Sequence, residues 1–251
     1  MYNTNAPGSS GKMLLASPSS LTMYQLAKSA HRFDMSVQVC TDVGTALALV
    51  KRQKFDAVTV DLSLGHSASS ILEETRQSPA NRTAVSFAIS STPEQSSAAF
   101  HAGSSFVLER PLSMDAIRRT LHAAHGLILR ERRRYFRCPV RVPASIRQEG
   151  AANQVFGETS DVSEGGMALH MLIPLNVGTE GMVQFMLPET FTPIRAQAKV
   201  IRSDDNGQAG VEFLALSERD NSQLQQWVAK KFDALLPSAS PFSAAAWCEL
   251  T

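Results

Sequence analysis

The chain has 251 residues, of which 43% are hydrophobic and 19% are charged, with 24 basic and 23 acidic side chains. This length suits two domains of roughly 100–130 residues each. The apolar fraction is large enough for packed cores and excludes a chain that is disordered throughout, and no glycine period or heptad repeat indicates a fibrous protein.

The sequence also indicates the cellular compartment and the state of the cysteines. No stretch approaches the roughly 18 apolar residues of a membrane span, and the N-terminus lacks the pattern of a secretion signal, so we expect a cytoplasmic protein with no membrane span. Cys40, Cys138 and Cys248 are far apart and predict ordinary thiols rather than disulfides or a zinc site.

The near-zero net charge conceals an uneven distribution. Residues 1–125 hold 11 basic and 9 acidic side chains, residues 126–150 hold 7 and 2, and residues 151–251 hold 6 and 12. Six arginines and one acid lie between Arg130 and Arg141. Arginine suits phosphate oxygens and the faces of flat rings, so this basic stretch is the first candidate for a binding site.

Residues 1–11 are rich in Gly, Ser and Asn and predict a flexible leader. Residues 12–125 then alternate short apolar runs with helix-length amphipathic stretches, a pattern typical of buried parallel strands in a doubly wound α/β domain. The predicted strands are 13–16, 37–40, 57–62, 83–89 and 106–108.

The polar ends of these runs resemble the receiver domain of bacterial two-component systems, a flavodoxin-like fold, over residues 12–125. Asp61 ends the third run, where that family carries its phosphate-accepting aspartate. Ser90 or Ser91 ends the fourth run, where it carries Ser or Thr, and Arg110-Pro111 follows the fifth, where it carries Lys-Pro.

The receiver resemblance is incomplete. The first run ends Ala16-Ser17-Pro18-Ser19, without the acidic residues that would hold Mg²⁺ beside the acceptor. We therefore interpret residues 12–125 as a degenerate, receiver-like scaffold for docking or dimerisation, in which Asp61 is a vestigial phospho-acceptor. An atypical response regulator phosphorylated at Asp61 is the alternative.

Residues 113–134 predict one long helix that runs into the arginine-rich stretch, and residues 126–137 are the predicted connector. Beyond it the pattern changes to period-two alternation, which predicts a six-stranded antiparallel β-barrel over residues 138–236 that ends in a helix starting at Ser217. Residues 237–251 are the predicted tail. The expected strands are 140–147, 154–161, 167–171, 179–187, 194–203 and 209–213.

Two short motifs lie at the start of this second domain. Arg133-Arg134-Tyr135-Phe136-Arg137 and Asp161-Val162-Ser163-Glu164-Gly165-Gly166 resemble the RxxxR and (D/N)xSxxG motifs of the PilZ domain, the bacterial receptor module for cyclic di-GMP. The resemblance covers about residues 130–235 and extends to Gly210-Val211-Glu212-Phe213, which is similar to the GVxF strand of the family.

The chemistry of these residues suits such a ligand. Cyclic di-GMP is a compact dianion with two guanines, and arginines offer forked donors to phosphate oxygens or to guanine O6 and N7. An ionised Asp161 accepts from the N1–H and N2–H₂ edge, Ser163 adds a hydroxyl, and the glycines allow close approach or positive φ. The resemblance implies a ligand site made of Arg132, Arg133, Arg134, Arg137, Asp161, Ser163, Gly165 and Gly166.

Arg132 precedes the first motif and could stack against a second nucleotide, which would allow an intercalated dimer of cyclic di-GMP. We expect no cofactor beyond this ligand and no metal site, because His122 and His125 lack a nearby third ligand. No Ser/His/Asp order, P-loop or GxGxxG indicates catalysis, so the predicted protein is not an enzyme.

The sequence thus predicts a signalling effector in which cyclic di-GMP binds at the interdomain arginine motif, changes the domain arrangement and alters contact with an unidentified protein partner. The prediction also allows a homodimer. The alternative is a PilZ-type adaptor that binds no nucleotide. Nucleic-acid binding is disfavoured, because the acidic C-terminal domain would repel a long polyanion.

Overall fold

The protein is described by a computed structural model that covers residues 10–150 and 153–236. Its contacts divide the chain into two units, with the boundary between Arg132 and Arg133, inside helix α5 (Met114–Tyr135). This helix closely matches the predicted helix over 113–134. Most of the predicted leader and the predicted tail 237–251 lie outside the described residues.

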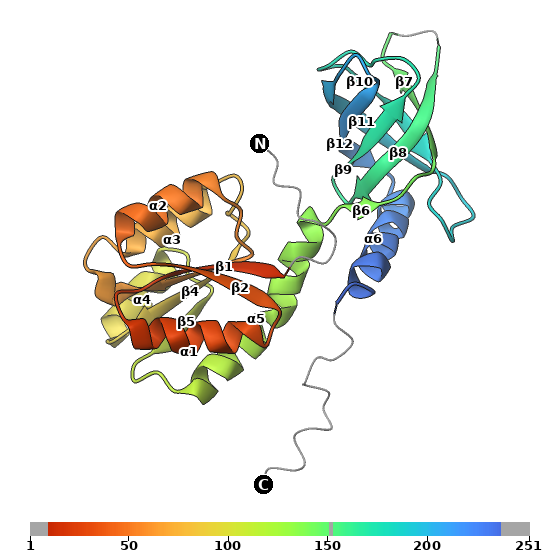
Figure 1. Cartoon of the computed structure of the whole chain (residues 1–251). Helices are drawn as coiled ribbons and strands as arrows, with labels where there is room; N and C mark the ends of the chain where they lie inside the picture. Colours follow the sequence, from red (N-terminus) through yellow and green to blue (C-terminus); the bar gives the residue numbers. More distant parts are fainter. Residues whose placement is uncertain (1–9, 151–152, 237–251) are drawn as a thin grey trace, which may run out of the picture. The chain divides into compact units, whose positions relative to one another are not determined.

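The first unit is a five-stranded parallel sheet with the strand order β2-β1-β3-β4-β5. This order defines a flavodoxin-like doubly wound fold, as the sequence predicted. Helices α1 and α5 lie on one face of the sheet, and α2 and α3 lie on the other (Figure 1). The elements are β1 (Gly11–Ala16), α1 (Ser20–His31), β2 (Met35–Cys40), α2 (Val43–Arg52), β3 (Ala57–Asp61), a 3₁₀ turn η1 (Leu62–Leu64), α3 (Ser69–Gln77), β4 (Val85–Ser90), α4 (Pro93–His101), β5 (Phe106–Glu109) and α5.

Local sequence explains where these helices begin. The side chains of Ser19, Asp42 and Thr92 each accept a hydrogen bond from a backbone N–H in the first turn of the following helix. Such caps satisfy donors that a helix leaves free at its N-terminus. Every residue of β3 and β4 is buried, which accounts for their mostly apolar sequences and places the end of β3 deep in the sheet.

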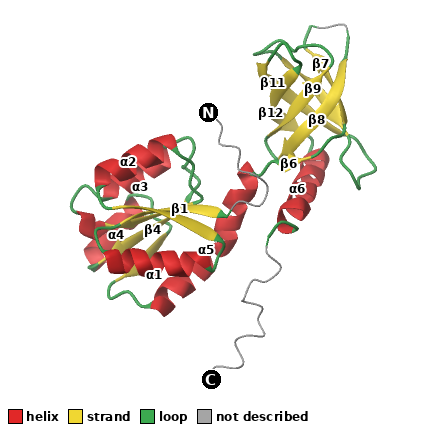
Figure 2. Ribbon diagram, viewed as in Figure 1, coloured by secondary structure: helices red, strands yellow, loops and turns green. Residues whose placement is uncertain are grey.

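The second unit is a closed antiparallel barrel of six strands, followed by a helix, which confirms the predicted architecture (Figure 2). Its strands run in the order β8-β7-β10-β11-β12-β9, and the pairing of β9 with β8 closes the barrel. A two-residue strand, β6, adds to the edge of β8. The elements are β6 (Cys138–Pro139), β7 (Pro143–Gln148), β8 (Val155–Ser163), β9 (Gly166–Met171), β10 (Glu180–Phe185), β11 (Ile194–Ser203), β12 (Gln208–Leu216) and α6 (Glu218–Asp233).

One predicted strand was wrong, because the structure divides it in two. The sequence pattern gave a single strand over 140–147, whereas the structure has β6 and β7 with a break between them. Pro139 and Pro143 flank the break, and proline has no N–H to donate to a ladder. Within the break, the backbone N–H of Val142 donates to the side-chain Oγ1 of Thr159, at 3.1 Å.

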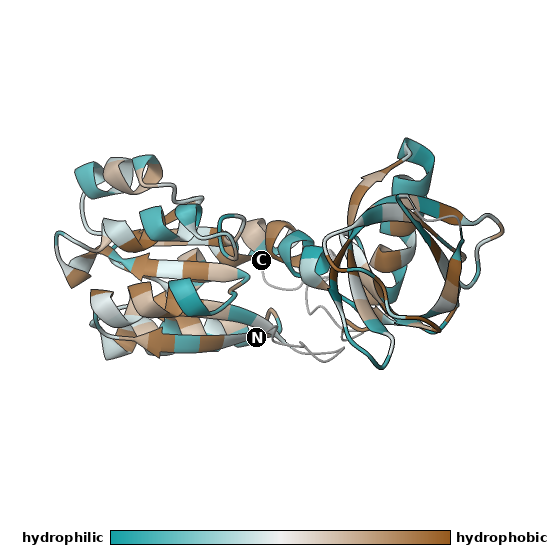
Figure 3. Ribbon diagram, turned by 90° about the horizontal axis from the view of Figure 1, so that it is seen from above, coloured by the Kyte–Doolittle hydropathy of each residue, from teal (hydrophilic) through white to brown (hydrophobic). Residues whose placement is uncertain are grey.

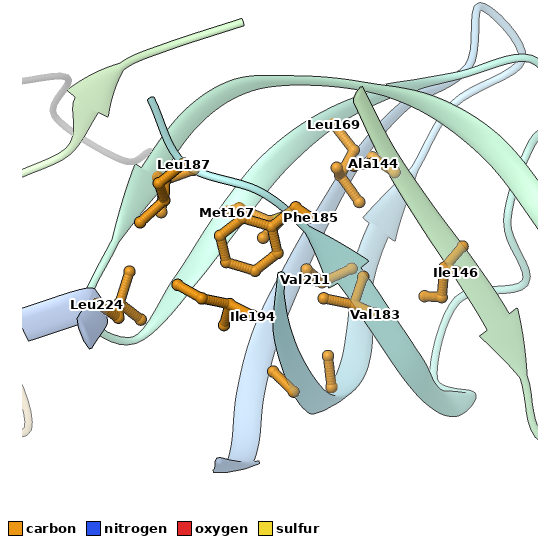
Figure 4. Packing of buried hydrophobic residues seen from close by; sticks show 14 of the residues in the cluster. Ala144, Ile146, Met167, Leu169, Val183, Phe185, Leu187, Ile194, Val211 and Leu224 are labelled. Atoms are coloured by element: carbon orange, nitrogen blue, oxygen red, sulfur yellow. The ribbon is translucent and has the colours of Figure 1, made fainter. Parts of the chain in front are cut away.

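The barrel core comes from the inward-facing side of each strand. Hydrophobic and hydrophilic residues alternate along the barrel strands (Figure 3), and β11 shows strict alternation of buried and exposed positions over Ile194–Val200. Phe185, Ile194, Val183, Val211 and Met167 pack together in the interior (Figure 4).

Helix α6 begins at Glu218, and the predicted first residue, Ser217, is its N-cap, whose side chain accepts from the backbone N–H of Asp220 at 3.1 Å. Its buried face consists of Leu224, Trp227, Val228 and Phe232. The Trp227 indole donates to the carbonyl of Pro188 at 3.0 Å, which ties the helix to the loop after β10.

Candidate functional site

The two motifs of the second unit meet through the short strand β6. Cys138 and Pro139 pair with Val162 and Asp161 of β8, so the residue before β6, Arg137, lies beside Asp161. The Arg137 guanidinium Nη1 donates to Asp161 Oδ1 at 2.6 Å. The side chains are 49% and 27% exposed, so the pair remains open to an incoming ligand. Two predicted site residues that are 24 positions apart are therefore in direct contact.

Ser163 and Gly166 flank the two-residue turn that joins β8 to β9. The buried Ser163 hydroxyl donates to the Gly166 carbonyl at 2.8 Å, and the two residues are also strand partners. Ser163 therefore has a structural task in addition to any contact with ligand.

Neither of the two motif glycines has a positive φ, and they differ in whether the structure has room for a side chain at that position. A Cβ at Gly166 would lie 2.2 Å from the carbonyl oxygen of Val211, so close approach of β9 to β12 requires glycine there. A Cβ at Gly165 would meet nothing within 4 Å. No atom of the barrel would collide with a side chain at position 165. The backbone at Gly165 is therefore open beside the candidate site.

Arg133 and Arg134 lie at the C-terminal end of α5. Arg134 is exposed. Arg133 Nη2 donates to Asp233 Oδ1 of α6 at 3.1 Å, and its guanidinium carbon lies 5.7 Å from the centre of the Phe232 ring. Neither Phe232 nor Asp233 belongs to a motif. No local pattern indicates a contact between residues 100 positions apart.

Arg132 belongs to the first unit. Its guanidinium Nη2 donates to Asp34 Oδ2 at 3.2 Å, and only 9% of its side chain is exposed. Its side chain also lies against Gly11, where a Cβ would come within 3.2 Å of Arg132 Cδ. Contact with a second nucleotide would require Arg132 to leave Asp34.

Cys138 lies at the edge of this site and is buried. Burial raises the pKa of its thiol; Lys231 opposes the shift and Asp161 adds to it. The thiol thus stays protonated at neutral pH and behaves as a packing group rather than as a nucleophile.

The first unit also holds an arginine–carboxylate pair with a buried carboxylate, at Asp61. This carboxylate is fully buried at the end of β3, and Arg110 Nη2 donates to its Oδ2 at 2.7 Å. Ser17 Oγ donates to the same oxygen at 2.7 Å, while the backbone N–H and the hydroxyl of Ser63 donate to Oδ1 at 3.1 and 2.7 Å. Arg110 Nη2 also donates to Thr22 Oγ1 at 3.2 Å. Both oxygens of Asp61 therefore have partners.

The donors around Asp61 do not fit Mg²⁺. The ion prefers an octahedral shell of oxygens with one or two carboxylates, whereas a cationic guanidinium already contacts Asp61. In the part of the chain that the structure describes, no group of three or more His, Cys, Asp or Glu residues could hold a metal ion. The geometry favours a structural role for Asp61.

Comparison with known proteins finds a family model for the second unit. Residues 131–230 match the family model of the PilZ domain. The PilZ domain of CeSA from a cellulose-synthesizing bacterium is 22% identical, with a TM-score of 0.32, over 38% of this chain and 96% of that chain. The search of curated proteins finds no match.

Solved receiver domains resemble the N-terminal half. The receiver domain of a sensor histidine kinase from Pseudomonas aeruginosa PAO1 is 19% identical, with a TM-score of 0.42, over 47% of this chain and 98% of that chain. A CheY-like receiver domain protein from Methanospirillum hungatei JF-1 is 13% identical, with a TM-score of 0.44, over 49% and 99%.

The fold and the site define a protein that joins a receiver-like α/β unit to a β-barrel module. The barrel module, over residues 131–230, matches the PilZ domain, and the PilZ family is a family of cyclic di-GMP receptors. Within the described ranges, no helix combines the length and apolarity needed to cross a membrane.

Proposed function

We propose that this protein is a signalling effector that binds cyclic di-GMP at the PilZ domain, through Arg133, Arg134, Arg137, Asp161, Ser163, Gly165 and Gly166. The observation that carries the proposal is the solvent-accessible Arg137–Asp161 pair, which brings both motifs to one place on the barrel surface.

The pair offers complementary chemistry to a guanine nucleotide. Arg137 has five N–H donors and gives one to Asp161, so the remaining fork can serve a phosphate or the O6 and N7 edge of guanine. Asp161 is acceptor-only when ionised and matches the N1–H and N2–H₂ edge. The open backbone at Gly165 allows a flat ring to lie close to the chain.

Ligand binding is proposed to act on the arrangement of the two units. Arg133 and Arg134 lie on α5, directly after the boundary between the units in the sequence. A ligand that holds these arginines against Asp161 restrains this part of the chain, so the domain arrangement and the surface available to a protein partner should change. Small-angle scattering with and without saturating nucleotide tests this step, and identical profiles would contradict it.

Calorimetric titration with cyclic di-GMP tests binding itself. Arg137→Ala should weaken affinity at least about tenfold, because a charge-assisted hydrogen bond contributes roughly 1.5–3 kcal/mol. Arg137→Lys should recover little, since an ammonium lacks the planar fork. Arg141→Ala is the matched control, because Arg141 is 82% exposed and lies outside both motifs.

Absence of heat with the wild-type chain would reject the proposal and favour the adaptor that binds no nucleotide. The same titration gives the stoichiometry. Two nucleotides per chain would support an intercalated dimer and the participation of Arg132, which must then leave Asp34.

A further inference from the structure

The two motif arginines are held by carboxylates of different origin. Arg137 contacts Asp161, which belongs to the second motif. Arg133 contacts Asp233, the last residue of α6, at 3.1 Å. Both residues of this second pair lie in the same unit as the proposed site.

The position of Asp233 is not explained by the stability of its helix. The C-terminal end of a helix carries partial negative charge, so an aspartate there is unfavourable, whereas Lys230 and Lys231 in the same turn are favourable. The contact with Arg133 is the interaction that compensates for this position.

Arg133 is only partly satisfied by its surroundings. Its guanidinium lies over the Phe232 ring, and Phe136 meets the same ring edge-on at 5.4 Å between centroids. The Nε atom of Arg133 is buried and has no hydrogen-bond acceptor among the described residues. A buried donor without an acceptor is costly, so this arrangement holds Arg133 weakly.

We propose that Asp233 is a built-in competitor for the ligand: it holds Arg133 on α6, and a phosphate of cyclic di-GMP must take Arg133 from it. The inference rests on the proposed function and adds the end of α6 to the residues that set affinity. A phosphate offers several oxygens to the guanidinium fork and can also serve Nε, whereas Asp233 accepts from Nη2 alone.

The expected size of the effect follows from exposure. The side chains of Arg133 and Asp233 are 30% and 57% exposed, so their ion pair is weak. Its removal should tighten nucleotide binding by about two- to fivefold, the range typical of such pairs. Removal of Asp161, by contrast, takes away a proposed ligand contact and should weaken binding.

The test is a titration of cyclic di-GMP into the full chain carrying Asp233→Asn, a change that keeps the side-chain shape and removes an unfavourable charge from the helix end. Affinity should rise about two- to fivefold. Asp205→Asn makes the same charge change at an exposed residue of the turn between β11 and β12 and should leave affinity at the wild-type value. Asp161→Asn should shift affinity in the opposite direction.

A double-mutant comparison separates competition for Arg133 from a general effect of charge. In an Arg133→Ala background, Asp233→Asn should change affinity no more than Asp205→Asn does. Equal tightening with and without Arg133, or wild-type affinity for Asp233→Asn, would overturn the inference and leave the proposed function intact. A wild-type chain that binds no nucleotide would overturn both.

Discussion

Two of the Asp–Arg pairs among the described residues have nearly equal lengths but different surroundings. The Asp61–Arg110 pair measures 2.7 Å, and its carboxylate is buried and hydrogen-bonded on both oxygens. The Asp161–Arg137 pair measures 2.6 Å, and its carboxylate side chain is 27% exposed, against 1% for Asp61. The same two residue types therefore form a pair without free capacity where the carboxylate is buried, and a pair that a ligand can reach where the carboxylate is exposed.

The difference is the reason why the proposed ligand site includes the Asp161–Arg137 pair and not the Asp61–Arg110 pair. A buried carboxylate whose partners are complete has no capacity for another group, and breaking it leaves a charge without compensation. An exposed pair holds its members loosely, so a stronger anion can displace the carboxylate. The first unit therefore uses its arginine for stability, and the second is proposed to use its arginine for binding.

The strongest test of this comparison is Arg110→Ala. We expect a loss of about 3 kcal/mol in the free energy of unfolding, because Asp61 would be buried without its cation. Chemical denaturation measures the change. Arg118→Ala, which breaks an exposed pair with Asp115, and Arg137→Ala should each cost less than about 1 kcal/mol. Equal losses for the three variants would remove the distinction.

A smaller effect is expected at the two adjacent glycines. Gly165→Ala should leave stability nearly unchanged, because the added methyl meets no protein atom, and should weaken cyclic di-GMP binding by roughly tenfold if the ligand approaches the backbone there. Gly166→Ala should destabilise the barrel, because its methyl would collide with the Val211 carbonyl. Thermal unfolding and calorimetry distinguish the two effects. Wild-type affinity for Gly165→Ala would show that this glycine does not serve the ligand.

The smallest effect concerns Glu189, an exposed carboxylate that accepts from Lys230 and Lys231 at 2.6 and 2.8 Å. These lysines lower the pKa of Glu189 from 4.5 to about 2. A lowered pKa gives stability that is present above the ordinary pKa and is lost as pH falls towards the folded value. The stability difference between wild type and Glu189→Gln should therefore shrink as pH falls from about 5 to about 2. A stability difference that grows as the pH falls would contradict a stabilising role for the contacts of Glu189 with the two lysines.

Much of the fold could be predicted because the patterns are local. Continuous apolar runs predicted the five parallel strands, and alternation predicted the barrel strands, with β11 at its observed bounds. The N-cap at Ser217 and the long helix that contains the arginines were predicted from residue spacing alone. The strand over 140–147 failed because the prolines at 139 and 143 outweighed the alternation.

The candidate site could be predicted only in part. The two motifs predicted Arg137 and Asp161 as site residues, and the structure shows that these side chains are in contact. The attachment of Arg133 to Asp233, and of Arg132 to Asp34, could not be predicted, since each joins residues about 100 positions apart without a motif on the acidic side. Such contacts depend on how helices and strands pack, which no local spacing records.

The sequence by itself determined two domains of different texture, a concentration of arginine between them and a pair of motifs typical of PilZ domains. Only the tertiary structure decided which arginines serve which unit, because burial and neighbouring carboxylates are properties of the packed chain. Arg110 is committed to a buried aspartate, Arg132 to the first unit and Arg133 to α6, while Arg137 stands at the surface beside Asp161. The same guanidinium group has a different availability in each place, because its availability depends on the solvent and the carboxylates around it.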